Sequence, residues 1–564
     1  MFDYFNSEYH ESLVKQLLPF AEEPIDIRSS ASISDLEEWK GTTSGRFTVS
    51  RWETSVPDIH LATLLFQSLR HLVPKTNKYF LDVDQPDILY LSTHEFRLWS
   101  QRVAAGLRKS GVKTGDRIWC YFTSANPAYV ARELGYQVKD SGALIVLCAE
   151  SNVETAIAGV KFAGLSPNSV FVFNEALFQE ARGSAQVDYR TYFGSVGCQY
   201  KGELVAEEEE GNRFHWDELT TPSLSSRTLA LNYSSGTTGV PKGVEISHKN
   251  VIANILQFNY LAQLDPSYKE KVSRRLCPLL MYHAMGQNMF IGIAITRGIP
   301  VHLMTKYDFA KFLHTIERFR ITDLTLVPPI VIRMAKDPQT RRYDLSSIKS
   351  IFCGAALTTS IVTAWHPLER SVDASVGELV PNCEARVVAE DGVTELGRNQ
   401  PGELWVRGLN VMKGYWGNKK ATEECLISDG WLKSGDVAYI DDGNKWHIVD
   451  RKKELIKVKG NQVAPAEPEG LLTEHPAVPD VAVIGVPHGN DEQPRAYVVR
   501  QAGKNRTPED FANFLISRVS RIKRVTGSVY FVDSIPKNPS GGILRKVLRE
   551  MDMSIIKTLG GSKL

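Results

Sequence analysis

The sequence predicts an α/β protein with more than one domain, and three observations lead to this fold class. The chain has 564 residues, which exceeds the length of one ordinary domain. Its hydrophobic content of 43% is enough for a sizeable core. Between residues 129 and 173, short apolar runs alternate with helical segments, as they do in an open, doubly wound sheet.

The helices and strands are expected in a regular order along the chain. Helices are expected at residues 61–72, 95–110, 129–141, 153–163, 309–319 and 331–335, and from residues 468 and 508 onward. Strands are expected at 118–122, 144–148, 169–173, 325–328, 348–353, 481–485 and 496–500, with hairpins at 80–91 and at the turn 441–443. Residues 401–415 are expected to form a short β subdomain, and the acidic run 207–210 a solvated surface loop.

Composition excludes several classes of protein. Lys plus Arg number 66 and Asp plus Glu number 65, so the net charge of +1 argues against nucleic acid as a dominant partner. The seven cysteines form no CxxC pair, which favours a reducing compartment and gives no indication of zinc. The most apolar window, residues 289–295, is too short to span a bilayer, so no transmembrane segment is expected.

The segment 229–250 places a polar turn directly after an apolar strand. The turn consists of Ser234, Ser235, Gly236, Thr237, Thr238 and Gly239, and Lys242 follows it. Small residues and hydroxyls leave backbone N–H groups open to a phosphate, and the lysine adds a point charge. The pattern is neither GxGxxG nor GxxxxGK[ST], because Gly243 follows the lysine. The alternative is an ordinary polar loop.

Further segments follow this loop in order and complete a recognisable set of motifs. They are 277–286 with His283, the small-residue turn Gly354-Ala355-Ala356, 431–437 with Asp436, 450–462 with Arg451, Lys457, Gly460 and Gln462, and 535–546. Over residues 57–550, the set resembles the acyl-adenylate-forming (AMP-binding) family, which includes acyl-CoA synthetases, 4-coumarate–CoA ligases and luciferases. Segments 126–140 and 365–367 are similar to the fungal 4-coumarate–CoA ligase-like branch.

The resemblance implies a fold and a reaction. The expected fold is a large N-terminal α/β domain with doubly wound sheets and a β subdomain, followed by a small mobile α+β C-terminal domain. In the family reaction a carboxylic acid and ATP give acyl-AMP and pyrophosphate, and CoA then displaces AMP to give an acyl-CoA thioester. ATP, Mg²⁺ and CoA are therefore the implied cofactors, and a small-molecule carboxylic acid is the implied substrate.

The resemblance also assigns roles to single residues. The loop from Ser234 to Lys242 would bind the triphosphate, and the 354–356 turn would pack against adenine, where small side chains admit a flat ring. Asp436 would accept the ribose hydroxyls, and Arg451 would meet the ribose. Gln462 would contact phosphate during adenylation, and Lys457 and Gly460 would serve the thioester step. His283 would lie beside the acyl carboxylate; the alternative is a histidine satisfied in the core. No metal ligand is assigned.

Four regions are expected along the chain. They are an N-terminal extension of unassigned role (1–56), the AMP-binding domain (57–449), a C-terminal lid domain that swings about Asp450 (450–550), and a tail (551–564). The tail ends in Ser562-Lys563-Leu564, a tripeptide that the peroxisomal import receptor recognises. Peroxisomal location and a fatty-acid or specialised-metabolite pathway, such as toxin biosynthesis, are therefore expected.

The chain departs from the family pattern at three places. An αβ element of about 25–35 residues is missing between residues 122 and 125. The Thr-Glu motif that contacts phosphate and magnesium is missing between residues 357 and 363, and nothing in the sequence places Glu369 or Glu378 on the metal. Gly542 occupies the position of the catalytic lysine, while Lys537 and Lys546 match other positions.

Three hypotheses therefore remain at this stage. The chain is an active ligase, a catalytically impaired nucleotide- or CoA-binding relative, or the product of a truncated gene model or splice variant of an intact ligase. Mis-called introns account for gaps that each fall on one structural element, but they do not account for Gly542.

Overall fold

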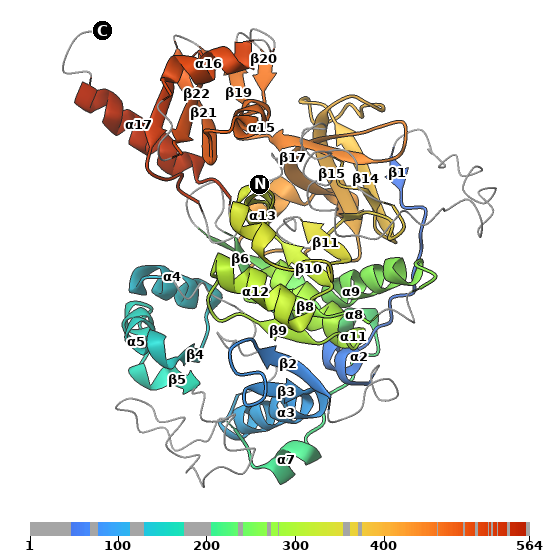
Figure 1. Ribbon diagram of the computed structural model, residues 1–564. Helices are drawn as coiled ribbons and strands as arrows, with labels where there is room; N and C mark the ends of the chain where they lie inside the picture. Colours follow the sequence, from blue (N-terminus) through green and yellow to red (C-terminus); the bar gives the residue numbers. More distant parts are fainter. Residues whose placement is uncertain are drawn as a thin grey trace.

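The computed structural model has a large N-terminal part and a smaller C-terminal part at one end of it (Figure 1). The structure describes residues 47–67, 77–112, 129–173, 205–234, 241–267, 272–279, 281–353, 361–369, 375–458, 461–488, 491–501, 506–516, 518–519, 523–526, 528–537 and 542–559.

A six-stranded sheet lies at the centre of the large part, with the strand order β11-β10-β8-β9-β2-β3. Its strands are β2 (Lys78–Asp82), β3 (Tyr90–Ser92), β8 (Arg275–Cys277), β9 (Val301–Leu303), β10 (Asp323–Leu326) and β11 (Ser350–Cys353). Neighbouring strands are parallel except for the β2–β3 hairpin. Short apolar parallel strands of this kind need helices on both faces.

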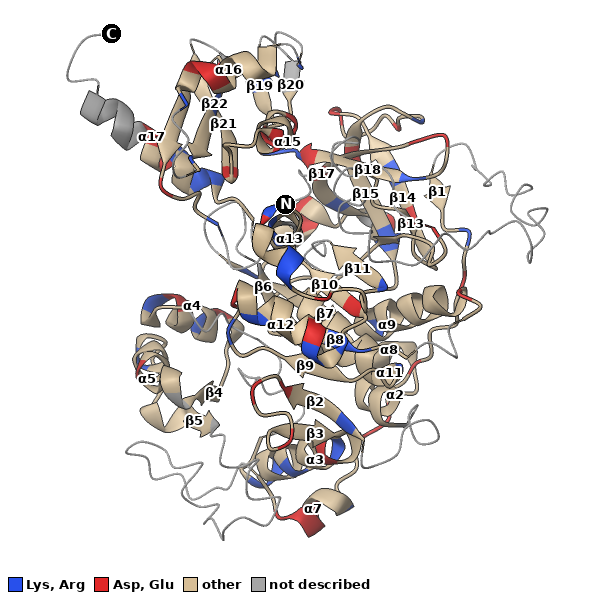
Figure 2. Cartoon of the chain, viewed as in Figure 1, with Lys and Arg blue, Asp and Glu red and all other residues tan. Residues whose placement is uncertain are grey.

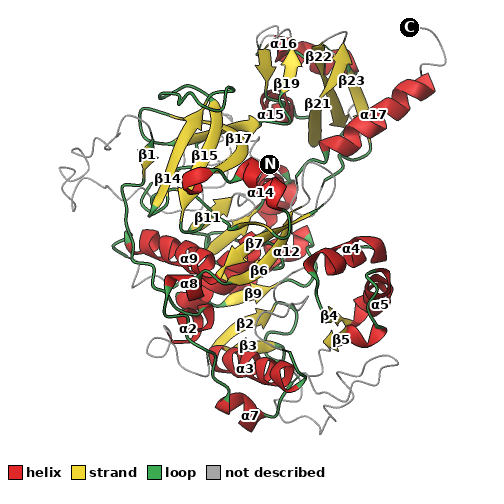
Figure 3. Cartoon of the chain, turned by 180° about the vertical axis from the view of Figure 1, so that it is seen from behind, coloured by secondary structure: helices red, strands yellow, loops and turns green. Residues whose placement is uncertain are grey.

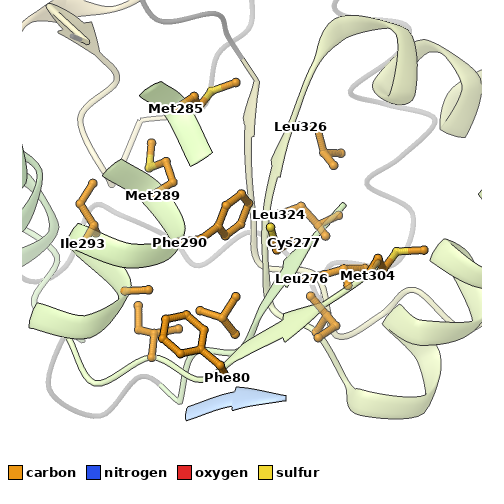
Figure 4. Close-up of a cluster of buried hydrophobic side chains, with 14 of the residues drawn as sticks. Phe80, Leu276, Cys277, Met285, Met289, Phe290, Ile293, Met304, Leu324 and Leu326 are labelled. Carbon is orange, nitrogen blue, oxygen red and sulfur yellow. The ribbon is translucent and has the colours of Figure 1, made fainter. Parts of the chain in front are cut away.

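Helices cover this sheet on both sides (Figures 1 and 3). They are α2 (Leu61–Gln67), α9 (His248–Gln263), α10 (Ala284–Gly286), the π-helix η6 (Gln287–Ile293), α11 (Ala294–Thr296), α12 (Phe309–Phe319) and α13 (Pro328–Lys336). Their apolar faces and the strands form the largest buried cluster. In this cluster Phe290 of η6 points toward Cys277 and Leu324 of the sheet (Figure 4).

Two smaller units adjoin the central sheet. The first has two parallel strands, β4 (Val146–Ala149) and β5 (Val170–Phe173), with α4 (Ala131–Ser141) and α5 (Val153–Phe162) packed on them around a separate apolar cluster. The second is the antiparallel sheet β16-β7-β6, formed by β6 (Thr228–Ser234), β7 (Lys242–Ser247) and β16 (Gly414–Tyr415). The remaining short elements of this half are η3 (Glu150–Asn152), η4 (Pro167–Ser169), α8 (Pro222–Ser225) and η7 (Pro338–Arg342).

A five-stranded antiparallel sheet, β1-β14-β15-β17-β18, forms the β subdomain. Its strands are β1 (Thr48–Val49), β14 (Cys383–Val388), β15 (Gly402–Gly408), β17 (Leu432–Ile440) and β18 (Trp446–Arg451). Because β1 pairs with β14, the end of the N-terminal extension belongs to this subdomain. The strands β12 (Thr363–Ala364) and β13 (Glu378–Leu379), the helix α14 (Lys419–Cys425) and the turn η8 (Ser428–Gly430) complete it.

The C-terminal part has its own core. The sheet β21-β22-β23 consists of β21 (Asp480–His488), β22 (Asp491–Val499) and β23 (Val529–Val532), and the hairpin β19 (Ile456–Val458) and β20 (Asn461–Val463) precedes it. The helices are α15 (Ala466–Glu474), α16 (Pro508–Ile516) and α17 (Arg545–Leu559). Lys336 of α13 joins the two parts, since its ammonium donates to the Thr473 carbonyl at the end of α15.

Most of the expected elements are confirmed, with shifts of a few residues at their ends. The helix expected at 309–319 has the same bounds in the structure, because Asp308 caps its first turn and Arg320 ends it in a left-handed conformation. The helix expected from residue 508 begins with a reciprocal cap between Thr507 and Asp510. The strand expected at 118–122 lies outside the described residues.

The prediction of a surface loop at residues 207–210 is wrong. These glutamates lie in and directly before α7 (Glu208–Arg213), marked in red in Figure 2, which packs against α3 (Thr93–Lys109). Three acidic residues in the first turn suit the positive end of the helix dipole, and Arg213 pairs with Glu209 one turn earlier. The expected solvent exposure is confirmed for Glu207 to Glu209.

Candidate nucleotide site

The candidate phosphate loop connects the two strands of a hairpin. Ser234 at the end of β6 pairs with Lys242 at the start of β7, and Tyr233 pairs with Gly243. A Cβ atom added at Gly243 would lie 3.1 Å from Cζ of Tyr233, so the glycine lets the aromatic ring pass close to the backbone. The loop residues Ser235, Gly236, Thr237, Thr238 and Gly239 lie outside the described residues.

Lys242 is held at the start of β7 by an aromatic ring. β16 pairs with β7, and this pairing places the Tyr415 ring centre 5.0 Å from the Lys242 ammonium, within the range of a cation–π contact. Burial raises the pKa of Tyr415, and the nearby Arg451 guanidinium partly opposes this rise. Lys242 and Tyr415 therefore meet, although the sequence separates them widely.

Asp436 and Arg451 form an ion pair across β17 and β18. The two residues are directly opposite in the register, and Arg451 Nε lies 2.7 Å from Asp436 Oδ1. The Asp436 side chain is buried, while about a third of the Arg451 side chain is exposed (35%), so the pair has one buried and one accessible member. A carboxylate fixed in this way is a strong acceptor of hydrogen bonds.

Asp450 connects this pair to the C-terminal part. Its buried carboxylate accepts a hydrogen bond of 2.6 Å from the Arg451 backbone N–H through Oδ1. Its second oxygen, Oδ2, lies 3.5 Å from the N–H of Ala466, the first residue of α15. The expected pivot residue thus lies in β18 and contacts the first helix of the C-terminal part.

Lys457 and Gln462 face each other on the β19–β20 hairpin. The Lys457 side chain is exposed, and its backbone N–H donates to Glu492 Oε2 at 2.9 Å. Gly460 and the Gln462 side chain lie outside the described residues, so the structure places these predicted site residues only through the hairpin that bears them.

His283 caps the short helix α10. Its Nδ1 accepts a hydrogen bond of 3.4 Å from the Met285 N–H, so we assign the ring proton to Nε2. Burial lowers the pKa of His283, which keeps the ring neutral near pH 7. Gln287 donates to the Tyr282 carbonyl at 3.0 Å and accepts a bond of 3.1 Å from Asn232 of β6. The His283 segment is therefore tied to the strand that leads into the phosphate loop.

The turn Gly354-Ala355-Ala356 lies outside the described residues, but the strand before it is well placed. β8, β10 and β11 are parallel neighbours, and the register pairs Leu326 with Cys353. The segments after β8 and β11, which contain His283 and the 354–356 turn, therefore leave the same edge of the sheet. Ligands of open α/β sheets bind at this carboxyl edge.

The carboxylates near the second departure do not fit a magnesium site. Glu369 and Glu378 both pair with Lys445, and Glu378 also pairs with Arg51 at 2.9 Å. Among the described residues, no group of three or more His, Cys, Asp or Glu side chains is placed to hold a metal ion. The second departure itself, up to residue 360, lies outside the described residues.

The lysines near Gly542 contact acidic residues of the C-terminal part. Gly542 is buried next to the bridge between Lys537 and Ile543. The Lys537 ammonium pairs with Asp480 at 2.7 Å within the C-terminal part. Lys546 lies on the exposed side of α17, 4.0 Å from Glu550. Both lysines are thus oriented by neighbours of the same domain.

The sequence alone did not identify Tyr415 or Tyr233 as part of the site. Tyr415 approaches Lys242 only because β16 pairs with β7, and Gly414-Tyr415 has no motif that indicates this pairing. Tyr233 directly precedes the polar turn, and this position in the sequence indicates a residue next to the candidate phosphate loop.

Comparison with known proteins identifies the family. A family model described as "AMP-binding enzyme" matches residues 120–370 and 358–416, and "AMP-binding enzyme C-terminal domain" matches residues 467–541. The chain is 33% identical over 508 residues to 4-coumarate–CoA ligase 3 of Oryza sativa subsp. japonica, covering 80% of this chain and 85% of the relative. It is 32% identical over 513 residues to 4-coumarate–CoA ligase 2 of Solanum tuberosum, covering 81% and 88%.

Solved structures share the fold. ATP-bound MatB from Rhodopseudomonas palustris superimposes with a TM-score of 0.71 at 24% identity, covering 87% of this chain and 98% of MatB. MenE from Bacillus subtilis, in complex with the acyl-adenylate OSB-AMP, superimposes with a TM-score of 0.65 at 20% identity, covering 86% and 98%. The expected α/β class, with a large N-terminal and a small C-terminal domain, is confirmed. The chain therefore belongs to the acyl-adenylate-forming family of AMP-binding enzymes, in its acyl-CoA synthetase and 4-coumarate–CoA ligase-like group.

Proposed function

We propose that this protein is an acid–thiol ligase that couples a small-molecule carboxylic acid to CoA at the expense of ATP. One structural observation supports the nucleotide half of this proposal above all others. Lys242 meets the ring of Tyr415 where β16 pairs with the phosphate-loop hairpin, Asp436 pairs with Arg451, and the charge of Arg451 acts on Tyr415. A cation at the loop suits the triphosphate of a nucleotide, and a buried carboxylate suits its ribose hydroxyls.

In the first step, a carboxylate oxygen of the acid attacks the α-phosphorus of ATP, and pyrophosphate leaves. We assign the ribose hydroxyls to Asp436 and the triphosphate to the loop between Ser234 and Lys242. His283, neutral and protonated at Nε2, would donate one hydrogen bond to the acid and orient its carboxylate without adding charge. The small residues Gly354, Ala355 and Ala356 are assigned to the adenine ring.

In the second step, the sulfur of CoA attacks the acyl carbon, and AMP leaves. We assign Lys457 and Gly460 to this step and Gln462 to the first. We propose that a movement of the C-terminal domain as a body brings the exposed Lys457 on the β19–β20 hairpin to the site. Asp450, which lies in β18 and contacts α15, is the residue about which we propose that movement.

Magnesium belongs to this proposal only as the ion that accompanies ATP. The described residues near the second departure are engaged in ion pairs with Lys445 and Arg51, so they do not fit a metal site and no step is assigned to one.

Gly542 supports a second candidate function, namely a relative that binds the nucleotide or CoA but adenylates poorly. The missing lysine would stabilise charge on the α-phosphate as the bond forms, and Lys537 is already paired with Asp480. A pyrophosphate-release assay on the full chain, with a panel of carboxylic acids, ATP and CoA, decides between the two candidates. Turnover that requires both acid and ATP supports the ligase, and ATP binding without turnover supports the impaired relative.

We further propose that the protein acts in peroxisomes, in a fatty-acid or specialised-metabolite pathway. The support is the C-terminal Ser562-Lys563-Leu564, which a peroxisomal import receptor would bind. Among the described residues, none of the helices is both long enough and apolar enough to cross a membrane. A fluorescent protein fused to the N-terminus should enter peroxisomes, and removal of the last three residues should abolish this. Unchanged distribution after the removal would contradict the proposal.

A further inference from the structure

Two side chains of α4 contact the protein on both sides of the phosphate loop. Tyr233 is the residue before the last residue of β6, and its hydroxyl donates to Asp140 Oδ2 at 2.6 Å. The Tyr136 hydroxyl donates to the carbonyl of Pro241, directly before β7, at 3.2 Å. Tyr136 and Asp140 lie one helical turn apart, so they face the hairpin together, and 3.5 Å separates the Tyr136 hydroxyl from Asp140 Oδ1.

The Tyr233 ring has little freedom to leave this arrangement. It lies against Gly243 of the opposite strand, where even a methyl group would come within 3.1 Å of the ring. Burial and the Asp140 carboxylate both raise the pKa of Tyr233, so its hydroxyl keeps its proton and remains a donor. The same two causes raise the pKa of Tyr136. The polar contacts from α4 are thus present over the whole physiological pH range.

α4 itself is a firm support for these contacts. Its buried residues Leu134 and Val138 belong to the apolar cluster of the β4–β5 unit. Gly135 and Gly159 let α4 and α5 approach closely, because a Cβ at either position would lie under 3 Å from the neighbouring helix. Gly142 then ends α4 in a left-handed conformation. Both views show α4 beside the β6–β7 hairpin (Figures 1 and 3).

We propose that Tyr136, Asp140 and Tyr233 are positioning residues that hold the two ends of the phosphate loop and thereby set its affinity for the triphosphate of ATP. These side chains act through the loop, and the nucleotide itself need not contact them. Ordering a loop before the ligand arrives lowers the entropy lost on binding. The proposal rests on the proposed nucleotide site. It gives the β4–β5 unit, which follows the first departure from the family pattern, a role in that site.

The first test measures ATP and CoA binding to the full chain by calorimetry. Tyr233→Phe and Asp140→Ala should each weaken ATP binding about five- to tenfold, since each removes the same charge-assisted hydrogen bond from a partly exposed site. Asp140→Asn, which keeps an acceptor oxygen, should restore most of the affinity. CoA binding should not change in any of these variants. A merely structural role would instead weaken both ligands together.

The double variant gives a sharper result. If Tyr233 and Asp140 act through one hydrogen bond, Tyr233→Phe combined with Asp140→Ala should be no weaker than the worse single variant. The matched controls are Tyr530→Phe, in the C-terminal domain, and Asp87→Ala, in an exposed ion pair with Lys78. Both controls should bind ATP like the unaltered chain. ATP affinities of Tyr233→Phe and Asp140→Ala equal to those of the controls would overturn the proposal.

A second measurement does not depend on ATP binding. Hydrogen–deuterium exchange of the ligand-free protein should be faster in Tyr233→Phe and Asp140→Ala at the backbone amides of residues 228–234 and 242–247, and unchanged in the C-terminal domain. Equal exchange in these segments would refute the positioning role. If the unaltered chain bound no ATP, the proposed nucleotide site would fail, while exchange would still decide whether α4 holds the loop ends.

Discussion

Replacing Asp436 by asparagine tests the candidate nucleotide site most directly. The carboxylate is buried and is aligned by Arg451 Nε at 2.7 Å, so its orientation is set before a ligand binds. Asparagine has nearly the same shape, but it replaces one acceptor oxygen by a donor and removes the charge. A hydrogen bond to a charged group contributes about 1.5–3 kcal/mol, so losing one ribose contact should cost about 2 kcal/mol, or about a 30-fold weaker affinity for ATP.

The same substitution should change stability only modestly. Arg451 is partly exposed, so water compensates much of its lost partner, and we expect a loss of about 1 kcal/mol. The assay is calorimetric titration with ATP, and CoA serves as the second ligand. Asp87→Asn, a surface residue paired with Lys78, is the matched control and should behave like the unaltered chain. An Asp436→Asn protein that remains folded and binds ATP with unchanged affinity would refute the assignment of the ribose to this carboxylate.

Three other predictions follow from the same structure. Burial next to the His60 ring holds the pKa of His248 at about 3, so between pH 7.5 and 5.5 the unfolded chain takes up a proton at this residue and the folded chain does not. His248 should therefore contribute about 1.4 kcal/mol to the fall in the free energy of unfolding over this range, and His248→Asn should reduce the fall by that amount in urea titrations at the two pH values; an unchanged fall would contradict this reasoning. Arg545→Met removes the guanidinium whose Nη2 donates to both oxygens of the fully buried Glu469, and it should destabilise the C-terminal domain by about 3–5 kcal/mol. Lys546→Met, on the exposed side of α17, should change the melting temperature little, and equal melting temperatures of the two variants would contradict this reasoning. Gly542→Lys should raise acid-dependent pyrophosphate release if the rest of the site is assembled, and an unchanged rate would mean that the segments missing near residues 122 and 357 limit the reaction.

Patterns within a single element were predictable from the sequence. The alternation of apolar runs and helical segments predicted the α/β class, and the cap residues Thr507 and Asp510 predicted where α16 begins. The acidic run at 207–210 shows where such reasoning fails. Its charge suggested a loop, but the helix dipole and packing against α3 favour a helix, and that packing depends on residues about a hundred positions away.

The sequence predicted individual residues of the candidate site, but it did not predict which of them contact each other. The motifs suggested Lys242, Asp436 and Arg451 through resemblance, and the structure shows that Arg451 and Asp436 face each other across two strands. The departures at Gly542 and near residue 357 were also visible in the sequence, because they are differences in the residues themselves.

The sequence by itself thus determined the family, the order of the motifs and the three departures from them, since these depend on residue identity and spacing alone. The tertiary structure decided which residues meet. The ring of Tyr415 reaches Lys242 through the pairing of β16 with β7, and Asp140 of α4 reaches Tyr233 from another unit of the fold. The physical reason is that such contacts follow from strand register and from the packing of distant elements, which no local pattern of residues encodes.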